Sequence, residues 1–129
     1  MASLSVLPNL YTADVDQATA FYRDLLGGVQ TFQYPASGPA EHVELRVGET
    51  IIALTHHDAV REAGLPEPTA GHPLELVVSC DSADDTVAAL RAAGTQILIE
   101  PHDHVAGHRR AYVTDPDGNW ITLVSRSRT

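Results

Sequence analysis

The sequence predicts an α+β fold built from two βαβββ modules, and three observations lead to this prediction. A five-residue turn, Asp115–Asn119, separates two strand-like runs, Arg110–Thr114 and Trp120–Val124. Its proline presets φ, its glycine supplies a positive φ, and its Asp and Asn side chains close local hydrogen bonds. The order strand, helix, three strands then occurs twice along the chain. Neither half is long enough to form a stable core alone, whereas 129 residues make one ordinary domain of two modules.

The first module is expected over about residues 4–55. The apolar run Leu4–Leu10 is the expected first strand. Asp14, with Gln17 three residues later, is a capping-box pattern that begins a helix, and the pair Gly27 and Gly28 ends it. Three short strand candidates follow the helix: Val29–Tyr34, His42–Val47 and Thr50–Thr55.

The second module is expected over about residues 73–126 and repeats this order. Leu74–Cys80 is the expected first strand, Ser82 begins the helix, and Gly94 ends it. Strand candidates follow at Gln96–Glu100, Arg110–Thr114 and Trp120–Ser125. A linker of about residues 56–72 joins the modules and carries a short helix candidate, Asp58–Gly64. A ferredoxin-like sandwich also alternates helices with antiparallel strands, but three strands in a row after each helix argue against it.

Composition excludes several classes of function. The formal charge is −9, with 17 acidic residues against 8 basic ones and no Lys, so a nucleic-acid-binding face is not expected. An acidic surface favours cationic or neutral small ligands. We expect a cytoplasmic protein, because no apolar stretch has membrane-spanning length and the N-terminus lacks the features of a secretion signal. The single cysteine, Cys80, excludes an intrachain disulfide and is expected to be a buried, inert thiol.

Alternation along the strands sorts the side chains into two faces. Val43, Leu45 and Val47 form an apolar set that should pack on a helix, as should Leu74, Leu76 and Val78. Their neighbours then point the other way. The candidate ligand-binding residues are the polar and aromatic side chains of this other face: Asn9, Tyr11, His42, Glu44, Arg46, Glu75, Arg110, Tyr112, Trp120 and Thr122. Trp and Tyr offer flat surfaces for planar ligands, while carboxylates and Arg fix polar groups.

Three segments carry a resemblance to a known family: Ala20–Gly27, Ala89–Gly94 and Asp115–Asn119. They resemble the glyoxalase/bleomycin-resistance/dioxygenase family, also called the vicinal oxygen chelate superfamily, and the resemblance covers nearly the whole chain. It implies a single domain of residues 1–129 whose two modules form a cleft, completed in a homodimer by exchange of modules. It implies no single function, because the family contains both metal enzymes and metal-free binding proteins.

The resemblance also identifies the positions of a metal site. Metal-using members take one ligand from the first strand and one from the last strand of each module, typically His and Glu. The matching positions here are Leu7, Ala53, Glu75 and Thr122. Leu and Ala have no donor atom, and a neutral Thr hydroxyl is a poor replacement for a carboxylate. A two-residue shift of the alignment, which keeps the face of a strand, does not restore a His and Glu set. We therefore expect no metal and no other cofactor.

The histidines are the rival signal for a metal. If their segment were a strand, His102 and His104 would point to the same side, which is a bidentate metal geometry, and His108 lies nearby. No residue at a suitable spacing supplies a third and fourth ligand. Exposed loop histidines are therefore the favoured interpretation.

The leading functional hypothesis is a metal-free small-molecule binding protein. It would resemble the family members that confer antibiotic resistance by sequestering a cytotoxic drug such as bleomycin or mitomycin. Trp120 and Tyr112 would stack on a planar ligand, while Glu44 and Glu75 would pair with a cationic or hydrogen-bond-donating ligand.

Two alternatives stay open. The first is an enzyme of the same fold, either a metal-assisted lyase, isomerase or dioxygenase, or a metal-free catalyst that uses Glu44, Glu75 and His42 as general acid and base. The second is an accessory or regulatory module whose task is dimerisation. The sequence does not identify which residues would be catalytic if the protein is an enzyme.

Overall fold

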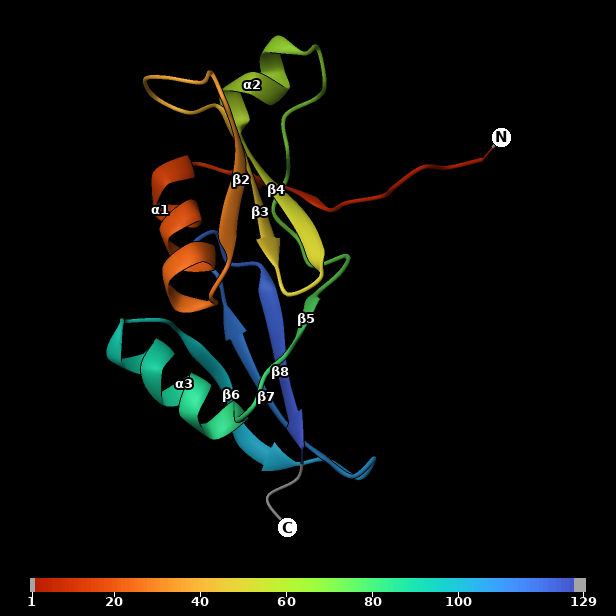
Figure 1. Ribbon diagram of the computed structural model, residues 1–129, viewed down its shortest axis with the longest axis vertical. Helices are drawn as coiled ribbons and strands as arrows, with labels where there is room; N and C mark the ends of the chain where they lie inside the picture. The colour runs from red at the N-terminus through yellow and green to blue at the C-terminus, as the bar shows by residue number, and fades with distance from the viewer. Residues whose placement is uncertain (1, 127–129) are drawn as a thin grey trace. The chain divides into compact units, whose positions relative to one another are not determined.

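The computed structural model describes residues 2–126 and divides into two compact units, with the boundary between Ala70 and Gly71 (Figure 1). Each unit contains one four-stranded sheet with a helix after its first strand. The predicted α+β class and the twofold βαβββ order are therefore confirmed. Within residues 2–126, no helix is long and apolar enough to cross a membrane.

The sheet of the first unit has the strand order β1-β4-β3-β2. Strand β1 (Asn9–Thr12) runs parallel to β4 (Thr50–His56), which is antiparallel to β3 (His42–Val47). Strand β3 is in turn antiparallel to β2 (Val29–Tyr34), and the bounds of β2 and β3 are those that the sequence predicts. A short helix, α2 (His57–Glu62), follows β4 and overlaps the predicted helix of the linker.

The first strand begins later than the predicted run Leu4–Leu10. Asn9 already lies opposite Ala53, near the middle of β4. The residue before it, Pro8, has no N–H to donate to the ladder and contributes only its carbonyl, which accepts from Ala53 N at 2.9 Å. The segment ahead of Pro8 is therefore not a strand, and Leu4 is 100% exposed.

Helix α1 (Val15–Ala20) begins at the predicted cap. The Asp14 side chain accepts from the backbone N–H of Gln17 at 3.0 Å, and the helix continues as a π-helical turn, η1 (Phe21–Leu25), which ends before Gly27 at φ +73°. The helix packs against β3 and β4. Buried apolar residues from the helical segment and from the strands form this core: Val15, Ala18, Phe21, Tyr22, Leu10, Val43, Leu45, Ile52 and Leu54.

The sheet of the second unit has the equivalent order β5-β8-β7-β6. Strand β5 (Leu76–Ser79) runs parallel to β8 (Trp120–Arg126), which is antiparallel to β7 (His108–Thr114). Strand β7 is antiparallel to β6 (Ile97–Asp103). The predicted turn between β7 and β8 closes on one carboxylate, because Asp115 Oδ1 accepts from the backbone N–H groups of Asp117 at 3.0 Å and Asn119 at 2.8 Å.

Helix α3 (Ala83–Ala92) begins at Ser82, whose hydroxyl accepts from Asp85 N at 3.1 Å, as predicted. Two core predictions beside it are wrong. Leu74 is 59% exposed, because it precedes β5 and has no sheet partner, while Leu76 and Val78 are only half-buried on this edge strand. Cys80 is half-buried rather than fully buried, with its Sγ 3.7 Å from the carbonyl oxygen of Val124.

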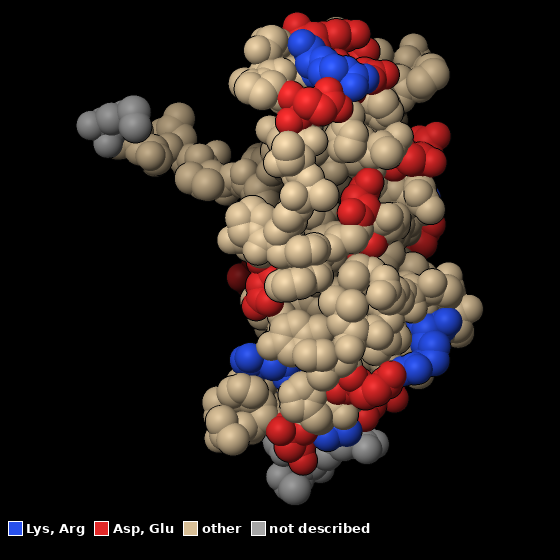
Figure 2. All heavy atoms as spheres, turned by 180° about the vertical axis from the view of Figure 1, so that it is seen from behind, with Lys and Arg blue, Asp and Glu red and all other residues tan. Residues whose placement is uncertain are grey.

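Charged side chains of both signs lie next to each other on the surface, although acidic groups are in excess. Figure 2 shows blue basic side chains beside red acidic ones on the face that it draws. At α2, for example, Arg61 Nη1 lies 3.0 Å from Glu67 Oε1, and Arg61 also pairs with Asp58. These pairs are more than half exposed, so we expect a small contribution to stability from each.

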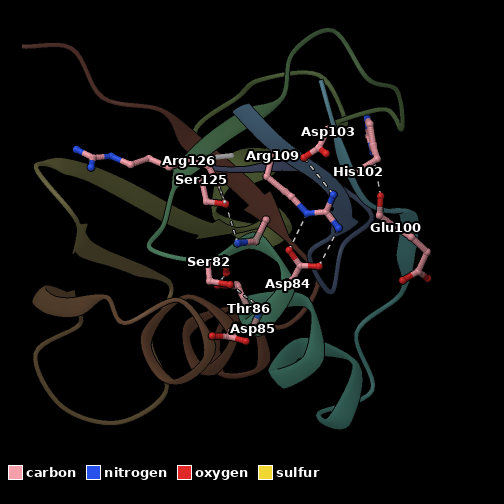
Figure 3. Close-up of polar contacts among 11 residues, drawn as sticks. Ser82, Asp84, Asp85, Thr86, Glu100, His102, Asp103, Arg109, Ser125 and Arg126 are labelled. Atoms are coloured by element: carbon pink, nitrogen blue, oxygen red, sulfur yellow. Dashed lines mark hydrogen bonds and ion pairs between the residues drawn. The ribbon is translucent and has the colours of Figure 1, made fainter. Parts of the chain in front are cut away.

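A less exposed ion pair fixes α3 to its sheet (Figure 3). Arg109 of β7 donates from Nε and Nη2 to the two carboxylate oxygens of Asp84, at 2.8 and 3.0 Å, and from Nη1 to Asp103 at 3.3 Å. The bidentate hydrogen bond to Asp84 is the main cause that raises the pKa of Arg109 above its ordinary value. The guanidinium therefore joins the first turn of α3 to the β6–β7 hairpin.

The close approach between the end of η1 and the sheet requires glycine at position 28. A Cβ at Gly28 would lie 2.7 Å from the carbonyl oxygen of Tyr22 and 3.2 Å from Val47 Cγ2. We expect Gly28→Ala to lower the free energy of unfolding by about 1–3 kcal/mol, because backbone must move to relieve the contact. Urea unfolding followed by circular dichroism measures this change.

Gly71→Ala is the matched control, because a Cβ at Gly71 would meet no atom within 4 Å. We expect the control to change the free energy of unfolding by less than about 0.5 kcal/mol. Equal stability of the two variants would contradict the packing described for Gly28.

Candidate functional site

Each sheet has one face against its helix, and we call the opposite face the distal face. In the first unit, the buried residues Val43 and Leu45 point to α1, so the alternate residues of β3 lie on the distal face. The register places His42 opposite Thr55 and Glu44 opposite Ala53. Four of the predicted residues of this unit, Asn9, Tyr11, His42 and Glu44, share this face, and the exposed Arg46 completes the predicted set.

A continuous chain of hydrogen bonds crosses this face. Thr55 Oγ1 donates to Asn9 Oδ1 at 2.7 Å, and the same hydroxyl lies 2.8 Å from His42 Nδ1. The other ring nitrogen, His42 Nε2, lies 2.9 Å from Glu44 Oε2. This series of hydrogen bonds therefore links β1, β4 and β3 through side chains alone. Thr55 is 9% exposed, while His42 and Glu44 are more open, with 26% and 30% of their side chains exposed.

The directions of these bonds restrict where the protons lie. An ionised Glu44 only accepts, so His42 Nε2 donates to it. The single hydroxyl proton of Thr55 points to Asn9, so His42 Nδ1 donates to Thr55. This arrangement places a proton on both ring nitrogens. A neutral ring satisfies the same chain only if the Asn9 amide turns over and donates to Thr55.

Aromatic side chains lie on both sides of this chain. Phe32 is opposite Glu44 and Tyr34 is opposite His42 on β2, while Tyr11 lies beside Thr55 on β1. The Phe32 ring meets the His42 ring edge to face, with centroids 6.0 Å apart. Phe32 is 50% exposed, Tyr34 59% and Tyr11 38%, so these rings offer apolar surface beside the polar chain.

Sequence reasoning missed Phe32, Tyr34 and Thr55. Strict alternation would put residues 30 and 32 on one face, but the register shifts between Gln30 and Phe32, so Gln30 pairs with Leu45 and Phe32 with Glu44. Thr55 has no local signal beyond its place at the end of a strand. Only its pairing with His42, which is 13 residues away in the chain, brings it into the site.

On the distal face of the second sheet, Trp120 does not stand alone. The ring of His72 stacks on the indole with a centroid distance of 4.0 Å and an interplanar angle of 7°. Thr122 lies opposite Tyr112 and beside Val77. It is 1% exposed, and within residues 2–126 its hydroxyl has no hydrogen-bond partner. The predicted Glu75 is exposed and precedes β5.

Several basic side chains lie on β7, at the end of this face away from Trp120. Arg110 donates from Nε to His108 Nε2 at 3.1 Å and from Nη1 to the Tyr112 hydroxyl at 3.3 Å. The ring of His108 stacks on His104, with centroids 4.9 Å apart. The expectation of exposed loop histidines is wrong for His102 and His108, which lie in β6 and β7 and are half-buried. His104 is also half-buried but follows the end of β6 at Asp103, so the strand alternative does not describe it either.

The residues at the metal positions of the resembling family do not form a suitable donor set. Ala53 is buried without a donor atom, Leu7 precedes β1, and the Thr122 hydroxyl is neutral. Within residues 2–126, no group of three or more His, Cys, Asp or Glu side chains is arranged to hold a metal ion. These residues do not fit the His and Glu site of metal-using members.

Comparison with known proteins gives one family. The family model described as "Glyoxalase/Bleomycin resistance protein/Dioxygenase superfamily" matches residues 5–123. Curated proteins of Mycobacterium bovis and Mycobacterium tuberculosis, both named "Putative glyoxylase CFP32", are 30% identical to this chain over 111 residues. The match covers 84% of this chain but 39% of those proteins, so the chain spans well under half of their length.

Solved structures agree on the fold. A family enzyme from Burkholderia phytofirmans is similar with a TM-score of 0.81 and 22% identity, covering 94% of this chain and 97% of that one. The fosfomycin resistance protein FosX from Listeria monocytogenes is similar with a TM-score of 0.70 and 18% identity, covering 99% and 97%. At this level of identity, the structural similarity establishes the fold and not the activity.

The hydrogen-bond chain can be tested with two threonines that differ in their partners. Thr55→Val keeps the side-chain shape but leaves Asn9 and His42 without the hydroxyl that joins them. We expect a loss of about 1–3 kcal/mol in the free energy of unfolding, because polar groups of low exposure lose their partner. Thr122→Val removes a buried hydroxyl that has no partner among the described residues, so we expect it to be neutral or stabilising. If urea unfolding showed a larger loss of stability for Thr122→Val than for Thr55→Val, the hydrogen bonds through Thr55 would be absent in solution.

The surroundings of His104, beside these basic side chains, predict that stability depends on pH. The pKa of His104 lies below its ordinary value, first because partial burial disfavours its charged form and then because of the positive charges of Arg110, His108 and His102. At and just below the ordinary value of about 6.5, the unfolded chain therefore binds more protons at this site than the folded protein does. Stability from this group should rise with pH through that window.

Urea unfolding at a series of pH values, compared between the wild type and His104→Gln, measures this contribution. We expect the wild-type free energy of unfolding to gain on that of the variant as the pH rises to about 6.5 and then to level off. A difference that stays constant, or that shrinks with rising pH, would be inconsistent with the lowered pKa.

Proposed function

The chain belongs to the Glyoxalase/Bleomycin resistance protein/Dioxygenase superfamily, and from this premise we propose that it is a small-molecule binding protein. In this proposal it binds a planar or cationic ligand by aromatic stacking and charge pairing, without a metal and without making or breaking a bond. The ligand class includes antibiotics, so a role in resistance by sequestration is part of the proposal.

The hydrogen-bonded chain on the distal face of the first sheet is the observation that supports this function. Glu44 contributes a carboxylate that is 30% exposed and is held in place by His42 at 2.9 Å. A carboxylate fixed in this way attracts a cationic or hydrogen-bond-donating group, because little side-chain freedom remains to be lost on binding. The neighbouring rings of Phe32 and Tyr34 supply flat apolar surface for the rest of the ligand.

The second sheet supplies further support through Trp120. Its indole already accepts the parallel ring of His72, so its geometry permits stacking on a planar group. Trp120 is 40% exposed, which leaves part of the ring accessible. We keep Trp120 and Tyr112 in the proposed ligand-binding set.

The donor set is the reason for proposing a metal-free protein. Leu7 and Ala53 cannot ligate a cation, and Thr122 lacks a charge, so only Glu75 has the chemistry of the usual His and Glu site. The proposed homodimer follows from the family resemblance, and gel filtration with light scattering would test it. The proposed cytoplasmic location follows from the composition.

A metal-free acid–base catalyst is the second candidate, and the His42–Glu44 pair is the observation that favours it. A histidine hydrogen-bonded to a carboxylate at one nitrogen and to a hydroxyl at the other has a fixed orientation, as a general acid or base requires. Chemical change of a bound ligand, followed by mass spectrometry, distinguishes catalysis from sequestration.

Equilibrium dialysis against a panel of planar and cationic antibiotics, including bleomycin and mitomycin, tests the binding function. For a cationic member that binds, we expect Glu44→Gln to raise the Kd roughly tenfold, because the substitution removes the charge but keeps the shape. Phe32→Ala should also weaken binding, through lost stacking surface.

Glu49→Gln is the matched control, since Glu49 is an exposed carboxylate in the turn after β3. It should leave the Kd unchanged to within about twofold. Failure of the whole panel to bind, or equal loss of affinity in the Glu44 and Glu49 variants, would refute the proposed site.

A further inference from the structure

A cluster of basic side chains lies where strands β6 and β7 meet, and we call it the hairpin cluster: His102, His104, His108 and Arg110. His102 is opposite Arg110 in the strand register, and His104 stacks on His108. All four side chains are half-buried. The cluster belongs to the second sheet, whereas Glu44 belongs to the first.

Arg110 differs from its neighbours because it has no carboxylate partner. Within residues 2–126, Arg23, Arg61, Arg91 and Arg109 each form an ion pair with an Asp or Glu, whereas the exposed Arg46 and Arg126 and the half-buried Arg110 form none. The acidic residues of the hairpin are already engaged by other arginines. Asp103 accepts from Arg109 at 3.3 Å, and Glu100 pairs with Arg91. A half-buried guanidinium without a counter-charge is unusual in a chain of net charge −9.

The hydrogen bonds of Arg110 orient the guanidinium without neutralising it. Nε donates to His108 Nε2 at 3.1 Å, and Nη1 donates to the Tyr112 hydroxyl at 3.3 Å. Neither acceptor is an anion, so these hydrogen bonds leave the charge of the guanidinium without a counter-charge. The remaining N–H groups of the planar fork are left to bind another acceptor, and such forks match carboxylate and phosphate oxygens.

Backbone groups also orient two histidines of the cluster, His104 and His102. His104 Nδ1 accepts from the backbone N–H of Ala106 at 3.1 Å, which leaves the proton of a neutral ring on Nε2 as a donor. His102 Nδ1 donates to the carbonyl of Glu100 at 2.9 Å, which fixes the orientation of its ring. The positive charge of Arg110 is among the causes that lower the pKa of His104, so the two side chains influence each other electrostatically. An anion bound here would relieve this repulsion.

We propose that Arg110, oriented by His108 and Tyr112, is the centre of an oxyanion-binding site that takes the carboxylate or phosphate group of a small molecule. This site shares Tyr112 with the proposed ligand-binding set, but it selects the opposite charge from Glu44, whose strand belongs to the other sheet. It gives a role to an arginine that has no anionic hydrogen-bond partner among the described residues.

The test is a titration of the uniformly ¹⁵N-labelled full chain with inorganic phosphate and, separately, with acetate, at constant pH and ionic strength. Two-dimensional NMR follows the Arg110 Nε–H signal and the backbone amides of β6 and β7. We expect saturable chemical-shift changes centred on Arg110. The anion with the lower Kd shows whether phosphate or carboxylate is the preferred group.

Arg110→Gln should raise the Kd of that anion roughly tenfold or more, because charge-assisted hydrogen bonds are lost. Arg110→Lys keeps the charge but not the planar fork, and should lie between the wild type and the Gln variant. Arg23→Gln is the control, since Arg23 is exposed, belongs to the first unit and pairs with Asp24. It should not change the Kd.

Absence of saturable shifts with both anions would overturn the proposal. So would shifts that persist in a folded Arg110→Gln variant, or that are equally large around Arg46, since either result would show general attraction of anions to arginine. Because antibiotic dialysis reports on Glu44 and anion titration on Arg110, failure of one site is distinguishable from failure of the other.

Discussion

The burial of one face of β3 against α1 is the constraint on which the first unit depends. Val43 and Leu45 are 2% and 0% exposed. A shift of the strand by one residue would expose both and would direct His42 and Glu44 into the apolar interior, where a charged pair is expensive to desolvate. The register is therefore fixed by apolar packing, and the polar site is a consequence of it. Because β3 and β4 then pair in only one way, His42 meets Thr55, and through it Asn9.

The second unit follows the same rule with different chemistry. Ala111 and Val113 of β7 are fully buried, so Arg110 and Tyr112 point to the distal face. The duplication of the βαβββ order thus repeats the packing and not the side chains of the distal face. The first sheet fixes a carboxylate there, and the second fixes a guanidinium. Arg109, one residue earlier, turns to the helix side and binds Asp84, which illustrates how alternation assigns adjacent arginines to different tasks.

Local signals were sufficient to predict much of the fold. The caps at Asp14 and Ser82 and the turn at Asp115–Asn119 depend on hydrogen bonds within a few residues, so the sequence identifies them. Alternation likewise placed His42 and Glu44 on one face. The sequence does not identify features that depend on pairing between distant segments. The extra residue that turns Phe32 to the face of Glu44 and the stacking of His72 on Trp120 both belong to this class. The late start of β1 arises from Pro8 together with the parallel register of β4.

The central claim is that His42 is held between a hydroxyl and a carboxylate on the distal face of the first sheet. The most direct measurement is a long-range ¹H–¹⁵N NMR spectrum of the histidine rings in the labelled full chain. We expect the His42 Nε2 proton, which Glu44 accepts, to be observable and protected from exchange, and the Nδ1 chemical shift to change in Thr55→Val. Ring protons of His42 that exchange as fast as those of a free imidazole, with spectra unaffected by Thr55→Val, would contradict the claim.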